Sequence, residues 1–179
     1  AKVPVFKIPM DIDVYVNGKV ERNRITILKS DETFEFAASS KPDLVNVDAQ
    51  KMLLCTKDEV KTSKEWAFQY QHAPLYLDRY EAITALAAMP NDSLAMNTLI
   101  AALNDKFWSL RKNAITYLKN MDVHGYEQTI ENKLIALAQK DDKSLVRTEA
   151  INYLNSNYND ATLQLIYENA LNDSSYSVI

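Results

Sequence analysis

The N-terminal third of the chain alternates apolar and polar positions, a pattern typical of half-buried β-strands. Ile12, Val14 and Val16 alternate with other residues, and Asn17-Gly18 follows them directly. Asn-Gly is a strong hairpin signal because a type I′ turn needs a positive φ angle at both of its central residues. The pattern therefore predicts a hairpin, with the return strand immediately after this turn.

The return strand changes phase along its length. Val20 is out of step with Ile25 and Ile27, which alternate with polar neighbours. One extra residue in a strand turns the following side chains to the other face of the sheet. We therefore expect a β-bulge near Asn23.

Further short strands are expected before residue 60, each bounded by turn signals such as Lys41-Pro42-Asp43. Roughly five or six short strands in so short a segment predict a small antiparallel Ig-like β-sandwich, which we place at residues 1–60. The strands expected beyond the hairpin cover residues 33–36, 44–47 and 52–54.

Near Lys61 the apolar spacing changes to the helical period. Thr62-Ser63-Lys64-Glu65 has the spacing of a capping box, and Pro74 ends the short helix that this box begins. Six further helices are expected near residues 75–88, 93–104, 107–120, 127–139, 144–156 and 160–172.

Three of these helices carry one motif, Arg-x-x-Ala-Ile-x-x-Leu. Its copies begin at Arg79, Arg111 and Arg147, at spacings of 32 and 36 residues. Self-similarity at such a period indicates stacked helical hairpins, each burying its apolar face against its neighbours. The apolar residues of the motif are Ala82, Ile83, Leu86, Ala114, Ile115, Leu118, Ala150, Ile151 and Leu154.

In two copies an aspartate precedes the arginine by six residues, as Asp105 precedes Arg111 and Asp141 precedes Arg147. This spacing resembles HEAT-type repeats, where the aspartate caps a helix and the arginine pairs locally. The first copy has Ala73 in place of the aspartate. We interpret that copy as an end repeat that docks on the β-sandwich.

The four residues 102–105 recur identically at residues 170–173. Six residues after Asp173 the chain reaches Ile179, which predicts that the helical domain at residues 61–179 is truncated inside a repeat. The predicted fold class is therefore α+β, an Ig-like sandwich followed by an α-α superhelix of HEAT-like repeats. We expect the exposed end of the stack to self-associate or fray at Leu163, Ile166 and Leu171.

Composition narrows the function classes. The content of 47% hydrophobic and 25% charged residues is ordinary for a globular protein, and only two glycines agree with much helix. A net charge of −4 offers no basic face for nucleic acid. No run of about 18 apolar residues predicts a membrane span.

No catalytic, cofactor-binding or metal-ligating residue can be assigned. His72 and His124 belong to no H-E-x-x-H motif, and two isolated glycines exclude the Gly-rich phosphate motifs. A Ser-His-Asp arrangement stays open, because spacing alone does not test it. Cys55 lies in an apolar run and is expected to be a small buried residue.

Two other groups of side chains are candidates for a role. Asp11 and Asp13 are expected on a solvated strand face, and Asp141 with Asp142 at a helix cap. Nine of the ten tyrosines lie in the helical half. They fit either packing between helices or a concave face that binds peptide.

A family resemblance also covers nearly the whole chain. Residues 41–48 with 52–54, the strand at 8–14 with its hairpin, and residues 68–76 with 78–82 carry it. These segments resemble the β-sandwich and helical entry that follow the catalytic domain in zinc aminopeptidases of the aminopeptidase N and leukotriene-hydrolase family. The bacterial members of Bacteroides type are the most similar.

This resemblance implies a metallopeptidase, a hydrolase whose zinc ligands and catalytic glutamate lie in an upstream domain. The chain would hold no cofactor of its own and zinc would belong to the parent protein. It would brace the upstream catalytic domain of the same polypeptide and wall the chamber for the peptide substrate. Localisation stays open between exported or periplasmic and cytoplasmic in a bacterium, because the true N-terminus is expected to be missing. The alternative is a free-standing helical-repeat scaffold that binds a protein partner.

Overall fold

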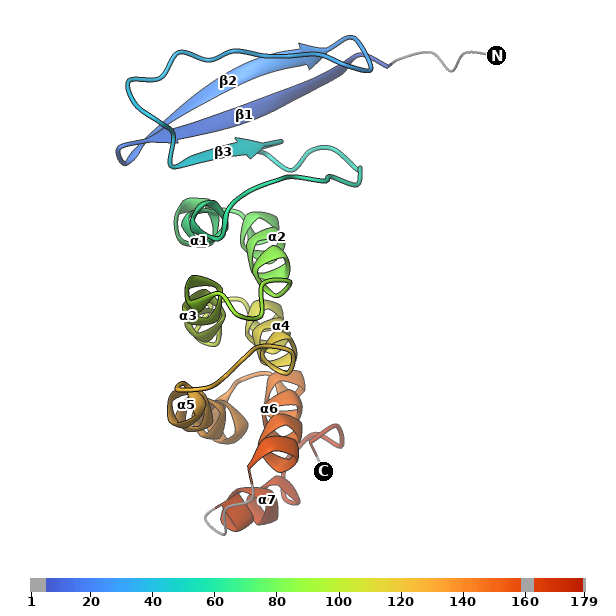
Figure 1. The fold of residues 1–179 in the computed structure, drawn as a ribbon. Coiled ribbons are helices and arrows are strands. Elements are labelled where there is room, and N and C mark those ends of the chain that lie inside the picture. Colours follow the sequence, from blue (N-terminus) through green and yellow to red (C-terminus); the bar gives the residue numbers. More distant parts are fainter. Residues whose placement is uncertain (1–5, 159–162, 179) are drawn as a thin grey trace.

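The computed structural model describes residues 6–158 and 163–178 (Figure 1). In these residues a three-stranded antiparallel sheet is followed by seven α-helices that stack beneath it. The strands are β1 (Ile8–Val16), β2 (Lys19–Ile27) and β3 (Leu44–Val47). The helices are α1 (Ser63–His72), α2 (Tyr76–Leu86), α3 (Ser93–Ala102), α4 (Trp108–Leu118), α5 (Glu127–Lys140), α6 (Ser144–Asn157) and α7 (Gln164–Ala170).

The hairpin prediction is confirmed. Strands β1 and β2 pair in antiparallel fashion around Asn17 and Gly18, whose φ angles are 51° and 74°. Both central residues therefore have the positive φ that the turn requires. Strand β3 pairs with the other edge of β1, which gives the order β2-β1-β3.

The predicted bulge near Asn23 is wrong. Pairing runs without interruption, with Asn23 opposite Ile12 and Ile25 opposite Met10. Val20 faces solvent, with 54% of its surface exposed, and the strand therefore keeps its regular alternation. A single exposed valine, which costs little, explains the phase change without an extra residue.

The sandwich is reduced to one sheet in the described residues, because two expected strands form no backbone ladder. Residues 33–36 and 52–54 have no strand structure. Phe36 and Leu53 still pack on the core formed by β1, so apolar alternation identified the buried side chains correctly. Alternation reports which side chains turn inward, whereas a strand also needs a backbone partner. The α+β arrangement itself is confirmed.

The helical start signal is also confirmed. The backbone N–H of Glu65 donates to the Thr62 hydroxyl, and the Thr62 N–H donates to the Glu65 carboxylate at 2.7 Å. Helix α1 ends before Pro74, as expected. All six further helices are present, although residues 160–162 of the last expected helix lie outside the described residues.

The helices form two columns, with α1, α3 and α5 in one and the motif helices α2, α4 and α6 in the other (Figure 1). A continuous apolar core runs between the columns from Trp66 to Ile166. At the far end Leu163 and Ile166 are buried, so the expectation that both lie on an uncovered face is wrong; Leu171 is 63% exposed. Helix α5 packs against α7 there, which accounts for part of this burial. The division of the chain near residue 60 stays a prediction.

Candidate functional site: an ionic joint and an arginine–aspartate ladder

The repeated arginines connect successive repeats. Arg79 Nε donates to Asp105 at 2.9 Å, Arg111 Nε to Asp141 at 2.6 Å and Arg147 Nε to Asp173 at 2.7 Å. Each arginine therefore reaches the carboxylate of the following unit, whereas a local pairing was expected. The local contact is to a backbone carbonyl: Nη1 of Arg111 donates to the Asp105 carbonyl at 2.9 Å.

Each aspartate also holds its own turn. The carboxylate of Asp105 accepts the backbone N–H of Phe107 at 2.8 Å, and Asp141 accepts that of Lys143 at 2.9 Å. The expected capping role is wrong for these two helix starts, because the N-cap residues of α4 and α6 are Phe107 and Lys143 and neither helix has a side-chain cap hydrogen bond. In the first unit, where Ala73 stands at the aspartate position, Arg79 Nη1 donates to the Pro74 carbonyl at 3.1 Å.

Two aspartates of the ladder, Asp141 and Asp173, have lowered pKa values. Burial alone would raise the pKa of Asp141, but the hydrogen bonds from Arg111 and from the Lys143 N–H outweigh it and lower that pKa. The hydrogen bond from Arg147 is the main cause of the lowered pKa of Asp173. In the Arg111–Asp141 and Arg147–Asp173 contacts, an ionised carboxylate therefore accepts two hydrogen bonds from one guanidinium.

The apolar residues of the motif lie between the helix columns. All nine except Ile151 are buried, and Ile151 is partly buried. Ala82, Ala114 and Ala150 are completely inaccessible, as expected for small residues at close helix contacts. The fourteen repeat residues thus divide into a packed apolar row and a polar row along the same stack.

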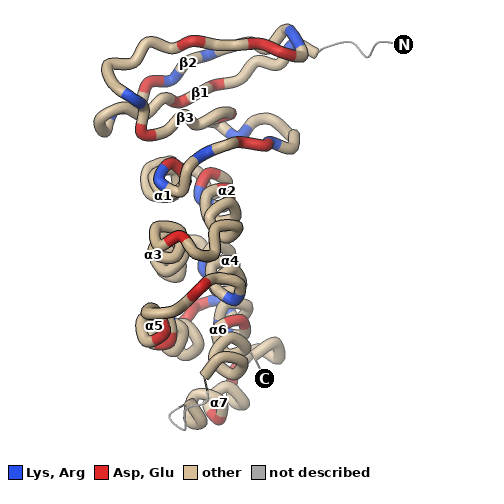
Figure 2. Tube along the Cα trace, in the orientation of Figure 1, with Lys and Arg blue, Asp and Glu red and all other residues tan. Residues whose placement is uncertain are grey.

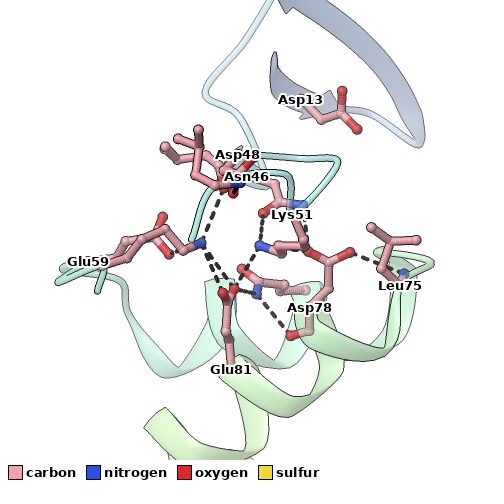
Figure 3. Close-up of polar contacts among 12 residues, drawn as sticks. Asp13, Asn46, Asp48, Lys51, Glu59, Leu75, Asp78 and Glu81 are labelled. Atoms are coloured by element: carbon pink, nitrogen blue, oxygen red, sulfur yellow. Dashed lines mark hydrogen bonds and ion pairs between the residues drawn. The ribbon is translucent and has the colours of Figure 1, made fainter. Parts of the chain in front are cut away.

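A second polar cluster joins the sheet to the stack, at the junction of β3, the following loop and α2 (Figure 3). Asn46 of β3 and Asp78 of α2 are both fully buried, and Asn46 Nδ2 donates to Asp78 Oδ1 at 3.0 Å. Lys51 Nζ lies 2.9 Å from Asp78 Oδ1 and 2.7 Å from Glu81 Oε2. We call Asn46, Lys51, Asp78 and Glu81 the ionic joint.

Other polar residues extend the ionic joint toward α1. Lys57 Nζ lies 3.1 Å from Glu81, and Lys61 Nζ lies 3.1 Å from Glu59. The buried amide of Gln69 accepts from Lys61 at 2.8 Å and donates to the Asp78 carbonyl at 3.0 Å. Each of these polar groups has a partner, which buried polar groups require.

Burial alone would lower the pKa of Lys51, but hydrogen bonds to Glu81 and Asp78 outweigh it and raise that pKa. Lys51 therefore stays charged inside the ionic joint. Removing one partner of such a buried pair would leave an uncompensated charge. The joint thus fixes how the sheet sits on the first helices.

The ionic joint was not predicted from the sequence. One signal was readable: Asn46 stands two residues after Leu44, so both face the same side of β3, and both are fully buried. A polar residue in phase with a buried leucine implies a buried hydrogen-bond partner. The partner, Asp78, lies 32 residues away, and no local pattern connects the two.

Two further ion pairs connect β1 and β2 of the sheet. Asp11 and Asp13 were expected to be solvated, but they are 7% and 3% exposed, so that expectation is wrong. They lie opposite Arg24 and Arg22 in the β1–β2 register and pair with them at 2.9 Å and 2.7 Å. The unbroken register explains the burial, because it brings each arginine over its aspartate.

Cys55 was expected to be buried and is exposed, so that prediction is wrong. It follows Leu53, which turns inward, in a segment that forms no strand. His72 lies at the end of α1 against Phe68, and His124 is an exposed turn residue near Glu127. Neither histidine side chain hydrogen-bonds to a serine in the described part of the chain.

Tyrosines of α2 and α4 pack against one another at the surface of the motif helices. Tyr76 stacks on Tyr80 with ring centroids 6.0 Å apart, and it contacts Phe107 at 4.6 Å. The Tyr117 hydroxyl lies 3.0 Å from the Thr84 hydroxyl. These contacts fit packing between helices.

Across residues 6–158 and 163–178, no three His, Cys, Asp or Glu side chains gather as a metal site would need. None of the described helices has the length and apolar character to cross a membrane. Basic and acidic residues are mixed along the molecule (Figure 2).

Comparison with curated proteins and with solved structures gives no match. The family of HEAT repeats matches residues 66–155 and again residues 96–179. These matches together cover well over half of the chain and contain helices α2 to α7 and every Arg–Asp contact of the ladder. The chain therefore belongs to the HEAT-repeat family.

Proposed function

We propose that the chain is a rigid, non-catalytic scaffold in which the HEAT stack holds the β-sheet in a fixed orientation. The ionic joint is the observation that carries this proposal. Asn46 and Lys51 come from the sheet side, Asp78 and Glu81 come from α2, and their contacts are 2.7–3.0 Å long. A flexible connection would not bury so many polar groups between two units, because each needs its partner in place.

Hydrogen exchange tests this rigidity. In a rigid scaffold, the slowest amides of β1 and α2 share one opening free energy, because neither unit opens alone. Amides of β1 that exchange through a separate opening, at markedly lower free energy than those of α2, would contradict the proposal.

A more specific form of the proposal follows from the family resemblance of residues 41–48 and 68–76. In this form the scaffold braces the catalytic domain of a zinc aminopeptidase and walls its peptide chamber. The zinc and the catalytic residues would belong to that domain. The purified chain should then neither bind zinc stoichiometrically nor hydrolyse aminoacyl anilides. Hydrolysis that survives repurification in proportion to the chain would contradict this form.

A second candidate is a free-standing scaffold that binds a protein partner. One observation favours it: beside the ionic joint, the segment after β3 exposes Met52 by 76% and holds Leu54 and Val60 fully in solvent. Apolar side chains gathered on one exposed segment are typical of interaction sites. Leu54→Ser in a longer parent protein distinguishes the two candidates by its zinc-aminopeptidase activity. Loss of that activity would favour the bracing role, whereas unchanged activity would favour this candidate.

A further inference from the structure

Strand β2 forms one outer edge of the sheet. The order β2-β1-β3 gives it a single partner, β1. The two residues that flank a two-residue hairpin turn form a hydrogen-bonded pair, and such pairs recur at every second position. Val16 and Lys19 flank the turn here, so the odd-numbered residues of β2 direct their backbone groups to β1. The residues whose backbone groups are directed away from β1 are Val20, Arg22, Arg24 and Thr26.

These outward backbone groups are open. Within the described residues, none of them forms a hydrogen bond to the backbone of another segment. The connection from β2 to β3 passes over the apolar face of the sheet, where Phe36 packs on the cluster of Met10, Ile12 and Val14. All four outward residues are exposed. A row of unpaired N–H and C=O groups is a place where a further strand can pair, and we call this side of β2 the free edge.

The arginines of the free edge have hydrogen-bond donors to spare. The side chain of Arg22 is 46% exposed and that of Arg24 is 62% exposed. Arg22 donates to Asp13 through Nε and Nη2, and Arg24 donates to Asp11 through Nη1 alone. No described residue accepts from the remaining guanidinium nitrogens of these two arginines. A carboxylate is the strongest acceptor for a guanidinium, so the exposed side of both arginines suits acidic side chains.

A second copy of the chain does not fit the free edge. Two β2 strands related by a two-fold axis would run antiparallel. Every register that keeps most of the outward residues paired then places Arg22 or Arg24 opposite an arginine of the other copy. Like charges directly opposite each other destabilise a sheet. The free edge therefore disfavours its own copy and favours a strand of opposite charge.

We propose that the free edge of β2 binds an extended acidic segment of a partner protein, with a carboxylate at every second residue and β-branched apolar residues between. The carboxylates lie opposite Arg22 and Arg24, and the apolar residues continue the face that carries Ile25 and Ile27. Strand β1 has the same pattern on the other side of β2, where its aspartates pair with the same two arginines. This inference goes beyond the scaffold role, because it concerns the outer edge of the sheet and not the ionic joint.

The test is an NMR titration of the ¹⁵N-labelled chain with the acetylated, amidated peptide Thr-Val-Asp-Val-Asp-Val-Thr. We expect saturable shift changes at the amides of Val20, Arg22, Arg24 and Thr26. The same peptide with Asn in place of both Asp residues is a control that leaves the chain unaltered. Its Kd should be higher by about fivefold or more, since hydrogen bonds between charged groups are about twice as strong as neutral ones.

Two variants of the chain locate the recognition on one face of β2. Arg24→Gln should raise the Kd of the Asp peptide by about fivefold or more, because it removes a guanidinium with free donors. Lys19→Gln is the matched control, since it removes the same charge from the same strand. Its side chain lies on the other face of the sheet, so the Kd should stay within about twofold.

A short free peptide loses much conformational freedom when it binds, so a second measurement joins the same segment to the N-terminus of the chain through a flexible Gly/Ser linker. Strand β1 begins at Ile8, opposite Ile27 at the end of β2, so the linker starts from that end of the sheet. The linked segment acts at an effective concentration in the millimolar range. Hydrogen exchange at the outward amides of Arg22 and Arg24 should then slow by about tenfold or more.

Protection in the linked protein that decreases when Asn replaces Asp supports the proposal, even where the free peptide binds too weakly to detect. Unchanged exchange at both amides overturns it, and so does equal protection by the Asn segment, because the charge is then not recognised. Shift changes that depend on chain concentration in the absence of peptide also overturn it, because they identify a second copy as the occupant. None of these results depends on the ionic joint, so the scaffold proposal is tested separately.

Discussion

At the scale of single residues, Asp141 connects three parts of the stack. Its carboxylate receives Arg111 at 2.6 Å from the preceding unit and the Lys143 N–H at the start of α6. Its carbonyl receives Arg147 at 2.8 Å. The neighbouring Asp142 also contacts Arg111, but its side chain is 70% exposed, whereas that of Asp141 is 2% exposed. Asp141 and Asp142 therefore allow a buried and an exposed ion pair with the same arginine to be compared.

Asp141→Asn should lower the free energy of unfolding at pH 7 by about 2 to 3 kcal/mol, because it weakens charged hydrogen bonds in a buried position. Asp142→Asn should cost less than about 1 kcal/mol, as exposed pairs do. The lowered pKa of Asp141 stabilises the fold above the unfolded pKa of about 3.9, and this stabilisation is lost as pH falls through the folded pKa. Urea unfolding between pH 7 and pH 3 should therefore show a weaker acid dependence in Asp141→Asn. Equal pH dependence in both variants would contradict the buried role.

Lys51→Met should be among the most destabilising single changes in the ionic joint. It leaves the buried carboxylate of Asp78 without its cation, for a cost of about 3 to 5 kcal/mol. Lys64→Met, on the exposed face of α1, should stay within about 0.5 kcal/mol of the parent chain. Chemical denaturation of both variants measures the difference, and similar stabilities would show that the ionic joint contributes little.

At the scale of elements, the motif alanines are buried in the apolar core of the helical stack. Ala114 of α4 is completely buried, whereas Ala136 of α5 is exposed. Both are helical alanines, so their intrinsic propensities are the same. The difference in burial alone should decide how each tolerates a larger side chain.

Ala114→Leu should destabilise the chain by about 1 to 3 kcal/mol, because added methylenes strain a well-packed core. Ala136→Leu should change the stability by less than about 0.5 kcal/mol. Thermal unfolding by circular dichroism measures both. A neutral Ala114→Leu would mean that the helices at this position are not closely packed.

The elements that could be predicted are those determined by residues close together in the sequence. The capping box at Thr62, the turn at Asn17-Gly18 and the repeated arginine motif each depend on residues within a few positions, and the structure contains all three. The missing strands at 33–36 and 52–54 depended on backbone partners elsewhere in the chain. The ionic joint was missed for the same reason, because its members meet only after the sheet docks on α2.

At the scale of the whole molecule, the chain is a stack of HEAT hairpins with a sheet fixed on its first repeat (Figure 1). The arginine–aspartate ladder connects hairpin to hairpin, and the ionic joint connects the first hairpin to β3. Because repeats contact only their neighbours, any loose connection would let the units move separately. The scaffold role therefore depends on these contacts acting together.

Residual dipolar couplings of the weakly aligned chain test this central claim most directly. The amides of β1 to β3 and those of α1 to α6 should fit one alignment tensor of the same magnitude and orientation. In Lys51→Met, the couplings of the sheet should decrease relative to those of the helices, because the ionic joint no longer fixes them. Two different tensors in the parent chain would show that sheet and stack move independently, which contradicts a rigid scaffold.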